Sequence, residues 1–265
     1  MTAFRLELRR SRSLLLWLGV TLLAYGRIIG AMQPVMKEND DLLRKYIEVF
    51  PKGFMAAFGM SGTLSDPGVF FTTYIASWLW PIIAAVAGLL LGTRAVATDL
   101  DRGFLDLPLA TRTSRVRYLA ASVWMQVVVL ALLAACAVLG MWAIGVMVGA
   151  PFDLVRFLEG GVLCFAFACA IAGPTTLLSV LTLSRGMTSA IVGGVLVTMY
   201  TVYVVTQVAT DWSAFAPLSA WHYFETTALI DDGTIPGPGL ALFALFAIGG
   251  WLGALWAFRG RDLAA

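Results

Sequence analysis

Six long apolar stretches, separated by shorter polar connectors, constrain what this chain can fold into. They cover about residues 14–32, 70–92, 119–148, 157–183, 187–209 and 239–258. A helix needs roughly 20 apolar residues to cross a bilayer core about 30 Å thick. With 60% hydrophobic and 13% charged residues, the chain also lacks the polar surface of a soluble protein of its size. We therefore predict one all-α membrane domain over residues 1–265, with six transmembrane helices.

The segment before the first apolar stretch, residues 1–13, is rich in arginine. A basic segment before an apolar run also describes a cleaved signal peptide, but this run is too long and five more follow it, which favours an uncleaved first helix. Phe4 and Leu8 have the spacing of one helix face, so the segment is expected to lie at the cytoplasmic membrane interface with its arginines near lipid phosphates. A disordered basic tip is the equal alternative.

The distribution of basic residues predicts the orientation of the helices. If the N-terminus is cytoplasmic, the inner segments hold twelve basic residues and the outer segments five, with Arg27 inside the first stretch. Cytoplasmic loops of membrane proteins carry such an excess of lysine and arginine. We therefore predict a multi-pass protein of the plasma (inner) membrane with both termini in the cytoplasm, and with the loop of residues 94–118 facing the cytosol.

The outer connectors carry their own patterns. In residues 33–66, apolar residues recur at helical spacing behind Asn39 and Asp40, which predicts a short amphipathic helix, and residues 51–59 predict another helical turn or two. Residues 210–237 contain no lysine or arginine but five aromatic residues, as is typical of a membrane interface. These are Trp212, Phe215, Trp221, Tyr223 and Phe224.

Small residues and proline inside the apolar stretches predict how the helices pack. Glycines four residues apart permit close helix contact, and they occur at 88 and 92, 145 and 149, and 249 and 253. Pro174 predicts a kink in the fourth helix, and Ser184, Arg185 and Gly186 predict a tight turn into the fifth. Cys136, Cys164 and Cys169 lie in apolar runs and are interpreted as small packing residues.

Several kinds of chemistry have no motif in the chain. A phosphate-binding loop requires a lysine in GxxxxGK[ST], and the three lysines all fall in the predicted outer connector of residues 33–66. The GxSxG and HExxH motifs are also missing, and the single histidine, His222, cannot build a metal site by itself. We expect this chain alone to be no enzyme, and to bind no metal or cofactor.

The polar segment between the second and third apolar stretches contains TDLDRGFLDLPLATRTSRVRY, residues 98–118. Phe104, Leu105 and Leu109 have spacings that permit an apolar stripe. Acidic residues lie at the start of this segment and basic residues at its end, an order that interacts favourably with the dipole of a short helix. On periodicity alone, an ordinary basic loop that fixes the orientation of the neighbouring spans is favoured over a helix that binds a soluble partner.

Residues Asp99 to Arg115, DLDRGFLDLPLATRTSR, resemble the segment after the second span in permease subunits of type-2 ABC transporters. The match is residue by residue at Gly103, Leu105, Leu107, Leu109, Ala110, Ser114 and Arg115, and the layout of basic N-terminus, six spans and aromatic outer connector is also similar. Phe104, Pro108 and Arg112 depart from the pattern. Because proline disrupts a helix interior, we predict helix up to Leu107 and a new turn from Pro108.

The resemblance implies a coupling helix in this loop that docks onto a separately encoded ATPase. The residues it assigns to ATPase coupling are Asp99, Asp101, Arg102, Gly103, Phe104, Leu105, Asp106, Leu109, Arg112, Ser114 and Arg115. It further implies two ATPase subunits that bind ATP and Mg, and a second permease, identical or related. Membrane lipid is an expected partner and nucleic acid is not.

By the same resemblance, substrate is expected to pass between the two permeases along the second and fifth spans. The candidate pathway residues are Ser77, Trp78, Trp80, Thr198, Tyr200, Thr201, Tyr203 and Gln207. Their aromatic and hydroxyl character favours export of a hydrophobic or amphiphilic substrate such as a drug, peptide or lipid. An ion-exporting permease, and a membrane scaffold or maturation factor associated with an ATPase, are the alternatives.

Overall fold

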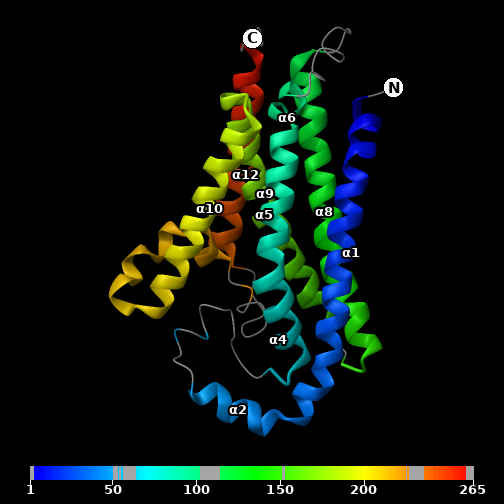
Figure 1. Cartoon of the computed structure of the whole chain (residues 1–265), viewed down its shortest axis with the longest axis vertical. Coiled ribbons are helices and arrows are strands. Elements are labelled where there is room, and N and C mark those ends of the chain that lie inside the picture. The colour runs from blue at the N-terminus through cyan, green and yellow to red at the C-terminus, as the bar shows by residue number, and fades with distance from the viewer. Residues whose placement is uncertain are drawn as a thin grey trace.

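The structure, a computed structural model, describes residues 3–49, 53, 55, 64–101, 114–150, 153–224, 226 and 236–260 (Figure 1). Every regular element in these residues is helical. The elements are α1 (Ala3–Glu38), α2 (Asp40–Val49), α4 (Pro67–Phe71), η1 (Thr72–Leu79), α5 (Trp80–Arg94), α6 (Ala97–Asp101), α8 (Arg115–Met147), α9 (Leu154–Thr182), α10 (Arg185–Val208), η2 (Thr210–Leu218), η3 (Ala220–Tyr223) and α12 (Gly237–Arg259).

Six helical rods are long and apolar enough to cross a membrane. They are Ser11–Glu38, Pro67–Arg94, Arg115–Met147, Leu154–Thr182, Arg185–Val208 and Gly237–Arg259. For the described residues, the prediction of an all-α protein with six helices long and apolar enough to span a membrane is thereby confirmed. Both chain ends and α6 lie at one end of the bundle, with α2 at the other (Figure 1), as an even number of crossings requires.

Helix α9 is the centre of the bundle, because α5, α8, α10 and α12 all pack against it, while α1 packs mainly on α8. Gly88 and Gly92 of α5 face α9 closely enough that a Cβ would approach Ile171 at 2.7 Å and Thr175 at 2.6 Å. The predicted packing role of this glycine pair is thus confirmed. Small residues let the two backbones come this close.

Of the glycine pair predicted for the last helix, only Gly253 faces α9, where a Cβ would lie 3.4 Å from the Leu177 side chain. Gly249 is exposed, and a Cβ there would meet nothing within 4 Å. The neighbouring Gly250 is the contact residue instead, since a Cβ there would lie 2.5 Å from the Pro174 nitrogen of α9 and overlap the Gly173 backbone. Helices α9 and α12 therefore cross backbone to backbone. Pro174 lies inside α9 without ending it.

The second span is built from three consecutive pieces. Asp66 caps α4 by accepting a hydrogen bond from the Val69 amide at 3.0 Å, and the chain then runs through a π-helical segment, η1, into α5. Pro81, in the first turn of α5, has no N–H to donate and its ring displaces the carbonyl four residues earlier. The wider π turn accommodates that loss, as the Trp80 amide donates to the Ile75 carbonyl. π turns occur frequently at functional sites.

The N-terminal segment differs from both structures expected for it. Helix α1 runs without a break from Ala3 to Glu38, so residues 3–13 continue the first span and form neither a separate interfacial helix nor an irregular tip. At its far end the Asn39 side chain donates to the Val35 carbonyl at 2.8 Å. The predicted amphipathic helix follows as α2. The second turn predicted at residues 51–59 lies mostly outside the described residues.

The turn between the fourth and fifth spans is tight, as predicted, but its centre is Leu183 and Ser184. Leu183 adopts a left-handed conformation with φ of 53° at the end of α9. The Ser184 hydroxyl accepts a hydrogen bond from the Met187 amide at 3.3 Å and so caps α10. Gly186 already belongs to that helix. The hydroxyls of Thr182 and Thr188 also share a hydrogen bond across the turn, 2.7 Å long.

Candidate functional site

The two stems of the polar loop are the part of the candidate coupling site that the structure places. Helix α6 leads into the loop, and α8 leaves it, with the Ser114 hydroxyl accepting a hydrogen bond from the Arg117 amide at 3.3 Å. Residues 102–113 lie outside the described residues. The helix break predicted at Pro108 falls among them, as do the candidate coupling residues Arg102, Gly103, Phe104, Leu105, Asp106, Leu109 and Arg112. Asp99, Asp101, Ser114 and Arg115 belong to the described stems.

Asp99 lies inside the protein, and this changes the role expected of it. Its side chain is only 3% exposed, and its Oδ2 accepts a hydrogen bond from the Tyr118 hydroxyl at 2.5 Å. A carboxylate in this position cannot present itself to a docked ATPase. Instead, the bond joins the entering stem, α6, to the leaving stem, α8.

A second set of hydrogen bonds attaches the entering stem to α9. The Ala97 amide donates to the Ser179 hydroxyl at 2.9 Å, and that hydroxyl donates to the Thr93 carbonyl at 3.3 Å. All three residues are buried. Because a buried amide without a partner is costly, Ser179 replaces the backbone partner that Ala97 lacks at the start of α6.

Apolar packing holds the same region. The turn between α5 and α6, Ala95 and Val96, is fully buried and forms one cluster with residues of α8, α9 and α12. These neighbours are Tyr118, Leu119, Val180, Ala254 and Phe258. The stems are therefore a rigid part of the helix bundle, and the residues between them are attached at both ends to a fixed base.

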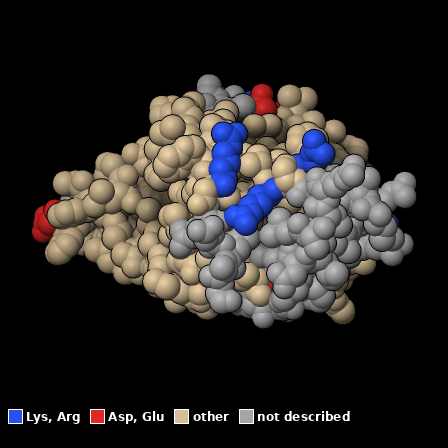
Figure 2. All heavy atoms as spheres, turned by 90° about the horizontal axis from the view of Figure 1, so that it is seen from above, with Lys and Arg blue, Asp and Glu red and all other residues tan. Residues whose placement is uncertain are grey.

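The end of the molecule that carries this base is basic. Arg117, Arg185 and Arg259 are exposed there, at the first turns of α8 and α10 and the last turn of α12. Figure 2 shows basic side chains near the middle of this face, beside the residues that are not described. Such a face attracts anionic lipid headgroups or an acidic protein surface.

The candidate pathway residues of the second span have three different environments. Trp80 is 1% exposed, and its indole N–H donates to the Cys164 carbonyl at 2.9 Å, so it holds α5 to α9 and lies on no open path. Ser77 shares a hydrogen bond of 2.6 Å with the Thr226 hydroxyl. Trp78, in contrast, is exposed.

The candidate pathway residues of the fifth span lie on the least buried of the long helices. Thr198, Tyr200 and Thr201 are exposed, and Tyr203 and Gln207 are half-buried. The two threonine hydroxyls donate to carbonyls of their own helix, at 2.8 Å and 2.9 Å, which leaves their methyl groups and oxygen lone pairs toward the surroundings. This face of α10 is mixed in polarity.

The outer connector after α10 links the two groups of candidate residues. The Tyr200 ring contacts Trp221 at 5.6 Å, and Phe167 of α9 contacts both Trp221 and Phe224, at 5.4 Å and 4.5 Å between centroids. Thr226 then reaches Ser77. Of the aromatic residues expected at the interface, Trp212 and Phe215 are exposed, but Phe224 is buried in the core.

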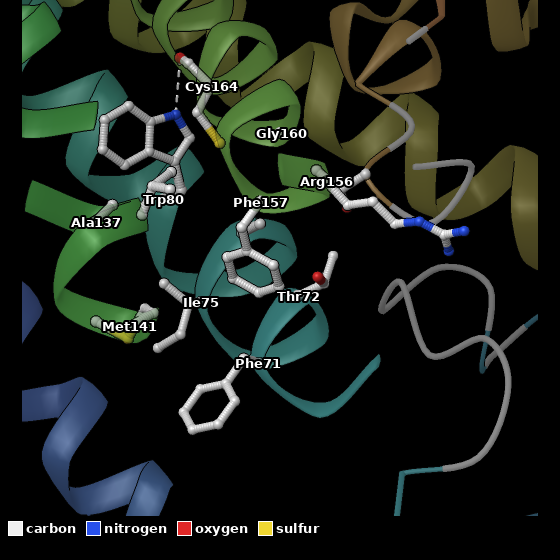
Figure 3. A pocket seen from close by; sticks show the side chains of 13 residues that line it. Phe71, Thr72, Ile75, Trp80, Ala137, Met141, Arg156, Phe157, Gly160 and Cys164 are labelled. Atoms are coloured by element: carbon white, nitrogen blue, oxygen red, sulfur yellow. Dashed lines mark hydrogen bonds between the residues drawn. The ribbon is translucent and has the colours of Figure 1, made fainter. Parts of the chain in front are cut away.

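A cavity of about 40 Å³ opens beside the π-helical segment. Ile75 and Trp80 of the second span, Met141 of α8, and Phe157 and Cys164 of α9 line it (Figure 3). Arg156 lies at its edge with the guanidinium directed away from the apolar wall (Figure 3), 3.9 Å from the Asp153 carboxylate. The cavity suits a small apolar group and lies within one chain.

A buried amide in the middle of the bundle was not singled out from the sequence. Gln126 of α8 is 1% exposed, and its Oε1 accepts hydrogen bonds from the Trp251 indole of α12 at 2.9 Å and from the Thr176 hydroxyl of α9 at 3.0 Å. The sequence could have indicated Gln126, because it is the one strongly polar residue within a long apolar run. The sequence could not have indicated its partners, which lie 50 and 125 residues away.

Among the described residues no group of three histidine, cysteine or acidic side chains is arranged to hold a metal ion, and the three cysteines are free. Comparison with protein-family models, with curated proteins and with solved structures finds no match to this chain.

Proposed function

We propose that this chain is the permease subunit of an ATP-driven exporter, working as a pair and driven by separate ATPase subunits that bind ATP and Mg. One observation carries the proposal. The loop whose sequence resembles a coupling helix is attached to two stems, and both stems are fixed by buried hydrogen bonds to the helices of the bundle. A loop held in this way can pass a displacement to the membrane helices, which an ordinary solvated loop cannot do.

The surroundings of the loop support the same role. The two stems of the loop lie at the end of the bundle that carries both chain termini and exposed arginines. Because of the excess of basic residues, we place this end on the cytosolic side of the plasma membrane. Helix α8 has 33 residues and a length of about 50 Å. It is longer than the hydrocarbon core, so its first turns reach beyond the bilayer toward a soluble partner.

The pathway is proposed to run along α10, between this chain and a second copy or a related permease. The exposed side of α10 combines hydroxyl groups, a tyrosine and apolar residues, and a surface of this kind interacts with both parts of an amphiphile. A hydrophobic or amphiphilic substrate, such as a drug, peptide or lipid, is therefore favoured over a hydrated ion. The proposed pathway leaves out Trp80, whose side chain is only 1% exposed.

Co-purification from native membranes tests the proposal. We expect the tagged chain to retain an ATPase with a phosphate-binding loop, and the complex to hydrolyse ATP. Reversing the charges in the loop, Asp101→Arg with Arg102→Asp, should release the ATPase. The matched control is Glu38→Lys at the opposite end of the molecule, which should leave the complex intact.

Two results would contradict the proposal: a chain that never retains an ATPase, or an ATPase that stays bound after the loop charges are reversed. The phenotype of cells lacking the chain then separates the substrate classes. Sensitivity to hydrophobic toxins supports the amphiphile exporter, while sensitivity to salts supports an ion exporter.

A further inference from the structure

We infer that Asp99 and Tyr118 form a positioning pair that makes the two stems of the coupling loop move as one body. The inference rests on the proposed function, because it concerns how a push on the loop reaches the membrane helices. The pair joins the two stems close to where each of them meets the loop. Asp99 is three residues before the first undescribed loop residue, 102, and Tyr118 is five residues after the last, 113.

The hydrogen bond between the two side chains is strong and protected. Its length of 2.5 Å lies in the range that O–H donors make to ionised carboxylates. Asp99 and Tyr118 are 3% and 4% exposed, so water does not compete for either group. Near the bundle end, a bond of this kind resists separation of α6 from α8 far better than a solvent-exposed contact would.

Without the pair, the two stems would have different attachments. Helix α6 is bonded to α9 through Ala97 and Ser179, while α8 starts with its own serine cap and packs along α1 and α9. The apolar contacts around Val96, Tyr118 and Leu119 would still join the stems, but such contacts are not directional, so a displacement entering at the loop would be shared less completely between α9 and α8. With the pair intact, α6 and the first turn of α8 share one displacement, which both membrane helices receive.

The alternative is that the pair contributes stability alone. The two roles make different predictions for Tyr118→Phe, which removes one hydroxyl and keeps the ring in its cluster with Leu119 and Val180. A stabilising role predicts a lower unfolding temperature with normal movement in the remaining folded protein. A positioning role predicts that the ATPase still binds to the variant and hydrolyses ATP, but that ATP no longer changes the distance across the outer end of the bundle.

The experiment uses the complete permease–ATPase complex in lipid nanodiscs, with Cys136, Cys164 and Cys169 replaced by alanine. Spin labels at Met147→Cys, on the exposed end of α8, and at Leu218→Cys, on the exposed end of η2, report the distance across the outer end. The distance is measured without nucleotide and with ATP, Mg and vanadate. ATP hydrolysis, ATPase stoichiometry and thermal unfolding are measured on the same samples.

We expect an ATP-dependent distance change in the parent complex, its loss in Tyr118→Phe, and a reduced change in Asp99→Asn, whose amide oxygen still accepts a neutral hydrogen bond. The double variant should be no worse than Tyr118→Phe, because both changes act on one interaction. Tyr25→Phe, which removes a hydroxyl from α1, is the control and should leave the change intact.

An unaltered distance change in Tyr118→Phe, with ATPase bound, overturns the positioning role and leaves the proposed function standing. A parent complex that retains no ATPase overturns the proposed function, and the inference with it. If Tyr118→Phe unfolds, Asp99→Asn still distinguishes the two roles. An ATP-dependent distance change in Asp99→Asn equal to that of the parent complex contradicts the inference.

Discussion

At the residue scale, the buried amide of Gln126 has a fixed orientation and an incomplete set of partners. The Trp251 indole can only donate, so it requires the amide oxygen, and the Gln126 Nε2 is left without a hydrogen-bond partner in the described part of the chain. A polar group inside a membrane bundle is costly to bury. The bond to Trp251 offsets part of that cost and ties α8 to α12.

This arrangement predicts that Trp251→Phe lowers the stability of the protein. The substitution removes one of the two donors to the Gln126 oxygen and leaves the Thr176 hydroxyl, so the loss is about 0.5–1.5 kcal/mol, and thermal unfolding followed by circular dichroism should shift to lower temperature. Trp256→Phe, on the same helix but 77% exposed, should show almost no shift. Combining Trp251→Phe with Gln126→Leu should cost less than the two single changes together, because both polar partners are then gone. Additive costs would mean that the hydrogen bond contributes little.

Residue roles in the coupling segment were only partly predictable. The sequence motif singled out Asp99, yet acidic residues in a polar loop are usually solvated, and nothing local indicated that Tyr118 would reach back and bury it. Ser179 accepts a hydrogen bond from the Ala97 amide, yet it lies 82 residues further along the chain, inside an apolar run. Partners of this kind are set by how the helices pack, which no spacing within one segment specifies.

At the element scale, the crossing of α9 and α12 depends on two glycines, because a Cβ at Gly173 would overlap the Ala247 backbone and one at Gly250 would overlap the Gly173 backbone. Gly250→Ala places a methyl group against the Gly173 backbone and 2.5 Å from the Pro174 nitrogen. Neither backbone can rotate away, so we expect a loss of about 1–3 kcal/mol or more. Gly249→Ala meets nothing within 4 Å and should be neutral or gain about 0.5–1 kcal/mol through helix propensity. Unfolding temperatures of the two variants test this, and equal temperatures would contradict the backbone contact.

The elements themselves followed from the apolar runs, because length and hydropathy determine whether a helix spans a membrane. Their ends were less predictable. Helix α1 begins well before its apolar stretch because no proline or glycine interrupts residues 3–13, and it continues beyond that stretch although Pro34 lies inside it. The π turn before Pro81 was missed, since a proline near the middle of a span predicts a kink and does not specify how the backbone absorbs it.

At the scale of the whole molecule, the exposed apolar surface is unevenly distributed. In the most apolar part of each span, 11% of the residues are buried in α10, 22% in α12 and 28% in α1, against 50% in the second span. These three helices therefore turn most of their apolar residues outward. The order and number of the spans were predictable from sequence, but the central place of α9 depends on contacts among four helices that hydropathy does not encode.

The orientation of the whole bundle gives the last prediction. Starting from the cysteine-free background, Gly186→Cys lies in the first turn of α10, at the end with both termini, and a Cβ there meets nothing within 4 Å. Glu38→Cys is exposed at the opposite end. Because the basic residues gather at the first end, we expect a membrane-impermeant maleimide to label Glu38→Cys in intact cells, and Gly186→Cys only after permeabilisation. The reverse pattern would place the loop of residues 94–118 outside the cytosol, where no ATP-driven partner could reach it.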